Sequence, residues 1–195
     1  MKILLLVTLM NLFHLSVNCQ TWNELTNCPK KLDHSVGFVI GNKFYTGLGF
    51  DSVYHGAITN NFFVYDIPSD SWSNIADFPG IARVQAVSFV IGNKAYVGLG
   101  WNSTTCFNDL WEYDPLTNLW IQKNNCPLPN CVYLGSSAFS INNKGYVMTA
   151  ADNSTTITHV LEYNPINDSW VQKNNFPGNR RCDASAFSTN TNGYF

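Results

Sequence analysis

The stretch from Val87 to Trp120, VSFVIGNKAYVGLGWNSTTCFNDLWEYDPLTNLW, decides the fold. It predicts one strand over 86–91 and a second over 95–98, joined by the turn Gly92-Asn93-Lys94, since Gly and Asn tolerate positive φ. A third strand over 110–113 ends at a turn that contains Pro115, and a fourth strand carries Trp120. Four short strands fill this segment and leave no room for a helix.

The same arrangement recurs along the chain. Each repeated tryptophan is followed seven residues later by a proline, and the last three are preceded by a tyrosine seven residues earlier. Because several positions repeat together, the pattern predicts an array of similar units. The tryptophans, 50, 48 and 50 residues apart, are Trp22, Trp72, Trp120 and Trp170, and the tyrosines are Tyr65, Tyr113 and Tyr163.

Four short strands in about 50 residues is the period of a β-propeller blade. A blade is a twisted sheet whose faces must be covered by its neighbours, so the repeated aromatic side chains should pack between blades. We therefore expect an all-β chain of about three four-stranded antiparallel blades that form an open, incomplete propeller, part of a longer protein. The units span 34–75, 84–123, 134–173 and, in part, 184–195 within a repeat region of 20–195, with the Trp22 strand as an N-terminal remnant.

The repeated residues resemble the kelch repeat. The resemblance rests on the Gly-Asn-Lys turn, a tyrosine-containing strand that ends in glycine, Tyr-Asp-Pro and the later tryptophan, and it covers Trp22 to Phe195. The Gly-x-Gly form is the one common in secreted bacterial kelch proteins. Two departures stand out: Met148-Thr149-Ala150 replaces the glycine motif of the third unit, and the arginine expected before the first strand is present only as Arg83 and Arg181.

The N-terminal residues favour export. Lys2 is followed by an apolar run from Ile3 to Met10, and interruptions at Asn11 and His14 leave no apolar stretch long enough to span a membrane. We expect a signal peptide over 1–19 and a secreted protein, extracellular or periplasmic. The alternative is a lipoprotein at the cell surface, with its lipid anchor on Cys19.

Composition narrows the function classes. The formal net charge is −2 and charged residues make up 12% of the chain, without a run of Lys or Arg, so nucleic acid is not an expected partner. No two histidines have metal-ligand spacing and no glycine-rich phosphate loop precedes a helix, so we expect no metal and no cofactor. No set of residues is placed as a catalytic group.

The irregular segments should share one face of the propeller. Strands alternate in direction, so the loops between second and third strands lie with the connections between units, and variable loops on a repeated scaffold are where binding residues concentrate. Trp101, which follows Gly98-Leu99-Gly100, is the leading candidate because an aromatic ring can stack on a sugar or a peptide. The expected binding patch is Trp101, Arg83, His55, Asp51 and Arg181. Residues of the opposite turns, such as Asn93 and Asn118, should be nearly silent in binding.

Cysteine usage adds one expectation. Cleavage after Cys19 leaves five cysteines, and export permits disulfides. Cys126 and Cys131 bracket a short loop, so a bridge between them is expected; the alternative is that both are small buried apolar residues, since Phe78 and Phe176 occupy the Cys126 position in other units.

Kelch propellers are mostly interaction scaffolds, so the resemblance implies a non-catalytic module that binds a glycan or a protein through one loop face. The alternative that it implies is a carbohydrate-active kelch enzyme, similar to sialic-acid mutarotases or galactose oxidases. Arg83, Arg180 and Arg181 would then meet a carboxylate, although neither a catalytic residue nor a set of copper ligands can be matched.

Overall fold

The computed structural model describes residues 23–52, 56–127, 135–148, 159–178 and 183–195, and within these ranges every regular element is a β-strand. The strands form three four-stranded antiparallel sheets and one hairpin, each with its strands side by side in chain order. The predicted kelch-type blades are therefore confirmed. Blade 1 is β1 (Val36–Ile40), β2 (Lys43–Gly47), β3 (Phe62–Asp66) and β4 (Ser71–Asn74); blade 2 is β5 (Val87–Ile91), β6 (Lys94–Gly98), β7 (Leu110–Asp114) and β8 (Leu119–Lys123); blade 3 is β9 (Ser137–Ile141), β10 (Lys144–Met148), β11 (Val160–Asn164) and β12 (Ser169–Gln172); the hairpin is β13 (Phe187–Ser188) and β14 (Gly193–Tyr194).

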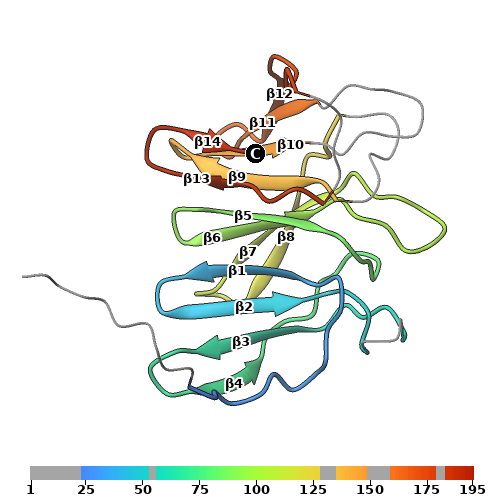
Figure 1. Ribbon diagram of the computed structural model, residues 1–195, viewed down its shortest axis with the longest axis vertical. Coiled ribbons are helices and arrows are strands. Elements are labelled where there is room, and N and C mark those ends of the chain that lie inside the picture. The colour runs from blue at the N-terminus through green and yellow to red at the C-terminus, as the bar shows by residue number, and fades with distance from the viewer. Residues whose placement is uncertain (1–22, 53–55, 128–134, 149–158, 179–182) are drawn as a thin grey trace, which may run out of the picture.

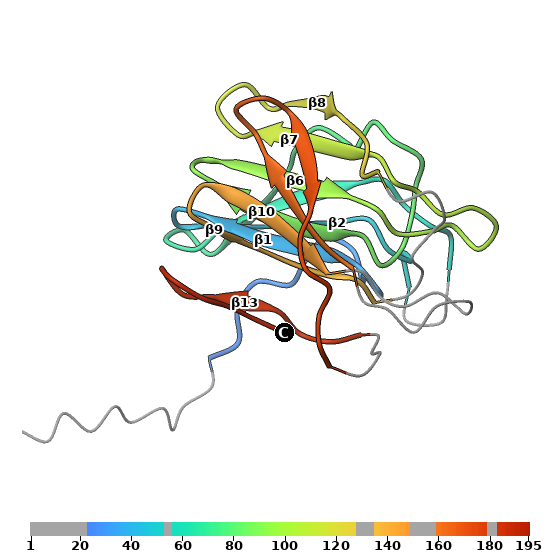
Figure 2. The same ribbon diagram turned by 90° about the horizontal axis from the view of Figure 1, so that it is seen from above.

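The blades lie side by side in an open arc (Figure 1). Their first strands are neighbours, since β1 contacts β5, β5 contacts β9 and β9 contacts β13. Figure 2 shows these inner strands on the side of the β13 hairpin and the outer strands β7 and β8 on the opposite side. We call the end that carries the short turns, at the left of Figure 1, the turn face, and the end that carries the longer loops the loop face.

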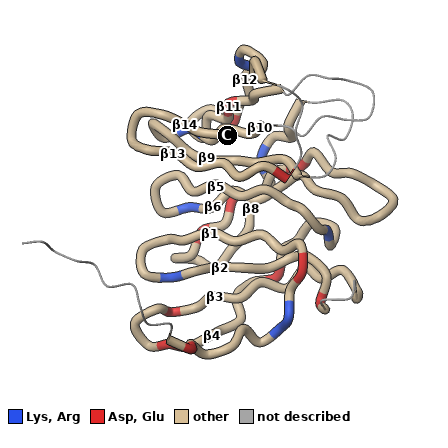
Figure 3. Tube along the Cα trace, in the orientation of Figure 1, with Lys and Arg blue, Asp and Glu red and all other residues tan. Residues whose placement is uncertain are grey.

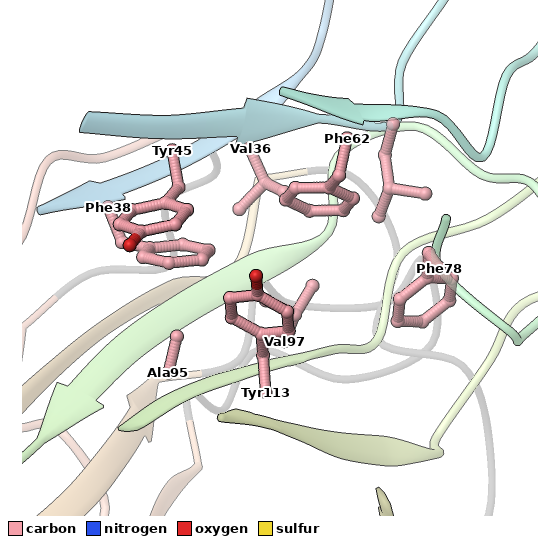
Figure 4. Close-up of a cluster of buried hydrophobic side chains, with 9 residues drawn as sticks. Val36, Phe38, Tyr45, Phe62, Phe78, Ala95, Val97 and Tyr113 are labelled. Atoms are coloured by element: carbon pink, nitrogen blue, oxygen red, sulfur yellow. The ribbon is translucent and has the colours of Figure 1, made fainter. Parts of the chain in front are cut away.

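An aromatic stack packs each blade against the next. Phe38 lies on Tyr45 with ring centroids 5.1 Å apart and ring planes 11° from parallel, and equivalent pairs occur in blades 2 and 3 and in the hairpin. Ala95 of blade 2 faces this stack, together with Val97 and Tyr113, in a cluster that is almost wholly buried (Figure 4). The hydrophobic core therefore lies between the sheets, as a propeller requires.

A second repeated feature joins the outer parts of the blades. The indole Nε1 of Trp120 donates a hydrogen bond to the carbonyl of Ala76 (2.9 Å), and the Asn118 side-chain oxygen accepts one from the Ala76 backbone N–H (2.9 Å). The same oxygen accepts from the Tyr113 hydroxyl, and Asn118 has a left-handed φ of 55°. We call this arrangement the clasp. Its equivalents are Trp72, Thr26, Asp70 and Tyr65 on blade 1, and Trp170, Asn124, Asp168 and Tyr163 on blade 3.

The clasp explains the sequence period. Each tryptophan covers the neighbouring tyrosine ring, with centroids 4.8 Å apart for Tyr113 and Trp120, and holds the chain segment that crosses the blade. Trp72, Trp120 and Trp170 each contact the tyrosine ring of their own blade and donate one hydrogen bond to the crossing segment, whereas Trp22 lies outside the described residues.

Candidate functional site at the loop face

Two aromatic side chains stand at equivalent places on the loop face of blades 1 and 2. Phe50 and Trp101 each follow the Gly-Leu-Gly end of a second strand. Each forms an isolated β-bridge to a residue three positions before the start of the inner strand of the same blade. The bridge partners are Asp33 and Val84, with backbone hydrogen bonds of 3.0 Å from Asp33 N–H to the Phe50 carbonyl and 2.9 Å from Val84 N–H to the Trp101 carbonyl. Backbone pairing therefore fixes the backbone positions from which both aromatic side chains extend.

Two polar residues with unusual backbone conformation connect these positions. His34 and Gln85 both have a φ of 54°, a left-handed conformation that is uncommon for residues other than glycine. The Gln85 N–H donates to the His34 carbonyl (3.1 Å), and the Gln85 side-chain oxygen accepts from the Trp101 indole Nε1 (3.0 Å). Strained residues of this kind cluster at functional sites, where the surrounding structure holds them in place.

We call Asp33, His34, Phe50, Gln85 and Trp101 the mouth cluster. The His34 Nδ1 lies 2.9 Å from an Asp33 carboxylate oxygen, and these side chains are 39% and 31% exposed. The His34 ring meets Phe50 edge-on, with centroids 6.0 Å apart. Trp101 is half-buried. The cluster thus offers partly exposed aromatic faces next to neutral and charged hydrogen-bonding groups, a combination that suits a sugar or a peptide side chain.

The expectation that Arg83 contacts a ligand is wrong in this structure, because its side chain is fully buried. Its guanidinium forms a two-pronged ion pair with Asp109, donates to the carbonyls of Ile81 (2.8 Å) and Leu99 (3.1 Å), and lies 4.1 Å from the centre of the Phe107 ring. Arg83 therefore holds the connection between blades against the second-to-third-strand loop. This pairing could not be predicted from the repeat, because Asn61 replaces the aspartate in blade 1.

Of the other residues of the expected patch, the structure places only Asp51. Asp51 directly follows Phe50, is half-buried, and pairs its backbone N–H with the Ala57 carbonyl (2.9 Å), so it lies beside the mouth cluster. His55, Arg180 and Arg181 lie outside the described residues. Gln85 was not predicted, because a glutamine before a strand has no distinctive pattern. Its equivalence to His34 in the repeat is the one signal that could have identified it.

The expected bridge between Cys126 and Cys131 stays a prediction, because Cys131 lies outside the described residues. Its side chain is 1% exposed and packs with Leu99, Leu110 and Leu161 between blades 2 and 3. Its backbone N–H bonds the Asn108 carbonyl (2.8 Å), as Phe78 N–H bonds Asn60 (2.9 Å) in the preceding blade. Cys126 thus fills an apolar position, while Cys131 lies outside the described residues. Cys106 is disulfide-bonded, and its backbone forms an isolated β-bridge with Trp101.

Two buried glutamates were likewise not anticipated. Glu162 accepts from Lys144 (2.5 Å) and from the Tyr146 hydroxyl (2.8 Å), with Lys173 3.2 Å away, and the hydrogen bond from Lys144 lowers its pKa to about 2. In blade 2 the equivalent Glu112 accepts from Lys94 and from the Tyr96 hydroxyl. Burial alone would raise the pKa of Glu112, but these hydrogen bonds outweigh burial and lower the pKa. Each network links strands of one blade, and both glutamate carboxylates are engaged in it.

Asn118 is not an inert reference residue for binding. It lies on the turn face as expected, but its two hydrogen bonds in the clasp make it part of the joint between blades. Asn93, an exposed residue of the β5–β6 turn, is the better control.

Positively and negatively charged residues are interspersed over the described blades (Figure 3). Among the described side chains, no group of three or more His, Cys, Asp or Glu is placed to hold a metal ion. The described ranges also contain no helix with the length and apolarity that a membrane crossing requires.

The repeated aromatic stacks, the clasps and the four-stranded sheets define the class of fold, which is that of a kelch-type β-propeller. The Kelch motif family matches residues 82–127, which span blade 2. The solved structure of YjhT superposes with a TM-score of 0.68 over 85% of this chain and 58% of that chain, at 22% identity, and this likeness shows the fold.

Several relatives share part of the sequence. A Kelch domain-containing protein of Vibrio cholerae is 38% identical over 104 residues, which are 49% of this chain and 27% of the relative. Proteins named N-acetylneuraminate epimerase are 33% identical over 128 residues in Haemophilus influenzae and 31% identical over 126 residues in Yersinia enterocolitica. Those matches cover 62% and 61% of this chain but only 32% and 31% of the two relatives.

Proposed function

We propose that this protein binds a carbohydrate outside the cytoplasm through the mouth cluster on its loop face, without catalysing a reaction on it. The observation that carries the proposal is the chain of contacts from Trp101 through Gln85 to His34, which holds an aromatic ring and polar groups together across two blades. Sugars present apolar faces and rings of hydroxyls, so a site for them combines an aromatic platform with nearby hydrogen-bonding groups.

Two further observations support the setting and the ligand class. The apolar N-terminal run resembles a signal peptide, and the disulfide at Cys106 suits an oxidising compartment. The relatives named N-acetylneuraminate epimerase make a sialic acid the first sugar to test.

Isothermal titration with N-acetylneuraminate, followed by a screen of other sugars, tests the proposal. Trp101→Ala should weaken binding about thirtyfold, because losing a central tryptophan commonly costs about 2 kcal/mol. Asn93→Ala is the matched control and should bind like the parent. Equal binding by a folded Trp101→Ala variant would show that the mouth cluster is not the site.

The second candidate function is a mutarotase that acts on N-acetylneuraminate, and the names of the relatives favour it. NMR exchange between the two anomers, measured with and without protein, separates it from simple binding. Faster exchange that Trp101→Ala reduces would establish catalysis in place of the binding module, whereas exchange at the buffer rate together with saturable binding supports the non-catalytic proposal.

A further inference from the structure

One position on the second strand of each blade decides what can pack against that blade. It follows a lysine or asparagine and precedes the tyrosine of the aromatic stack, and it holds Phe44 in blade 1, Ala95 in blade 2, Gly145 in blade 3 and Gly193 in the hairpin. We call it the contact position. Three of its four occupants are very small.

The small residues make room for the preceding blade. A Cβ added at Gly145 would overlap the Phe89 ring of blade 2, and a Cβ added at Gly193 would overlap the Phe139 ring of blade 3. Ala95 lies in the same buried cluster as Phe38 of blade 1 (Figure 4). The first-strand phenylalanine of one blade therefore occupies the contact position of the next.

Blade 1 fills this place with its own side chain. The Phe44 ring lies over Gly37, where a Cβ would come 2.9 Å from the ring, and it contacts Trp72 edge-on with centroids 6.3 Å apart. The residue equivalent to Gly37 is Ser88 in blade 2 and Ala138 in blade 3. Blade 1 thus has a matched pair of changes, a large residue at the contact position and glycine beside it.

We call the face of blade 1 that points away from blade 2, and that carries Phe44 and Trp72, the outer flank. This flank nevertheless continues the kind of interface found between the other blades. Thr26 engages Trp72 and Asp70 there in the same clasp that Ala76 forms on blade 2 and Asn124 forms on blade 3. In those two cases the clasped segment directly follows the outer strand of the preceding blade, so the clasp is the outer part of a contact between blades.

We propose that the outer flank of blade 1 is the contact surface for a blade that carries a small residue, rather than phenylalanine, at the first-strand position of the aromatic stack. The four described first strands carry Phe38, Phe89, Phe139 and Phe187, so none of them fits this flank, and neither does a second copy of this chain. Phe44 thereby restricts the outer flank to a blade with a small residue at that first-strand position, and it prevents head-to-tail association of copies of this chain.

The rule can be tested inside the chain, at the interface of blades 2 and 3. Ala138→Gly with Gly145→Phe copies the Gly37 and Phe44 pair into blade 3, where the backbone at Gly145 has no left-handed φ to forbid a side chain. Alone this pair should destabilise the protein, because the new ring meets Phe89. The triple variant that also carries Phe89→Ala should be more stable than the separate losses of the paired change and of Phe89→Ala would predict if they simply added. The expected difference is about tenfold in the unfolding equilibrium constant.

Urea unfolding followed by tryptophan fluorescence gives these values. If the paired change prevents folding, recovery of a folded protein on adding Phe89→Ala still supports the rule. Losses that simply add, or a triple variant that stays unfolded while Phe89→Ala alone folds, would overturn it. Sedimentation velocity over a range of concentrations is the second test. The Phe44→Lys variant should have the same sedimentation coefficient as the wild-type protein. Self-association of the wild-type protein that Phe44→Lys abolishes would also refute the proposal.

Discussion

Asn118→Ala tests how the blades are joined. Asn118 has a left-handed φ of 55° and its side-chain oxygen accepts from the Ala76 N–H and the Tyr113 hydroxyl, both at 2.9 Å. Alanine in this conformation costs about 1 kcal/mol relative to a residue that tolerates it. Each lost hydrogen bond costs about 1 kcal/mol more, and Tyr113 is only 1% exposed. The free energy of unfolding should therefore fall by about 3 kcal/mol.

Two further substitutions at the same residue separate these causes. Asn118→Gly keeps the left-handed backbone and removes only the hydrogen bonds, so it should cost about 2 kcal/mol. Asn118→Asp should stay within about 0.5 kcal/mol, because aspartate makes the equivalent bonds at Asp70 and Asp168. Urea unfolding followed by tryptophan fluorescence measures all three. Neutral effects of both Asn118→Ala and Asn118→Gly, or an Asn118→Asp variant as unstable as Asn118→Ala, would contradict this role of Asn118.

Three other predictions concern stability. Trp120→Ala should cost about 3 kcal/mol, as it loses contacts with Phe62, Phe78 and Tyr113 and one hydrogen bond, whereas the 89% exposed Leu116→Ala should be neutral in the same urea assay. Arg83→Met should cost about 3–5 kcal/mol by leaving Asp109 without its partner, and Arg83→Met with Asp109→Asn should cost less than the two changes summed; strict additivity would contradict the buried pair. The pKa of Glu162 is about 2 in the folded chain against an ordinary 4.5, so its stabilisation is full above pH 4.5 and is lost as the pH falls toward 2. Thermal unfolding over this range should show a smaller loss for Glu162→Gln, and an identical loss would reject that assignment.

The fold could be predicted from the sequence because the repeat exposes it several times. The tyrosine and tryptophan positions recur with a constant offset, and the structure shows why: each tryptophan must reach the segment that crosses its own blade. The assignment of loops to one face followed from strand alternation alone, and the described loop residues between β6 and β7 lie at the loop face (Figure 1).

The candidate site could be predicted only in part. Trp101 was found because it stands out at the end of a repeated glycine motif. Arg83 was misread as a surface group, since its burial depends on Asp109 and Phe107, which come from a loop that does not repeat. The left-handed conformation of His34 and Gln85 has no counterpart in their residue types, so the link between the two blades became visible only in three dimensions.

The central claim is that the mouth cluster binds a carbohydrate, and an NMR titration of the nitrogen-15-labelled protein with N-acetylneuraminate tests it most directly. We expect saturable shifts of the Trp101 indole N–H and of the Gln85 backbone N–H, with small changes at the turn-face residue Asn93. Failure of this sugar and of the other sugars in the screen to shift either loop-face signal, or largest shifts at the turn face, would contradict it.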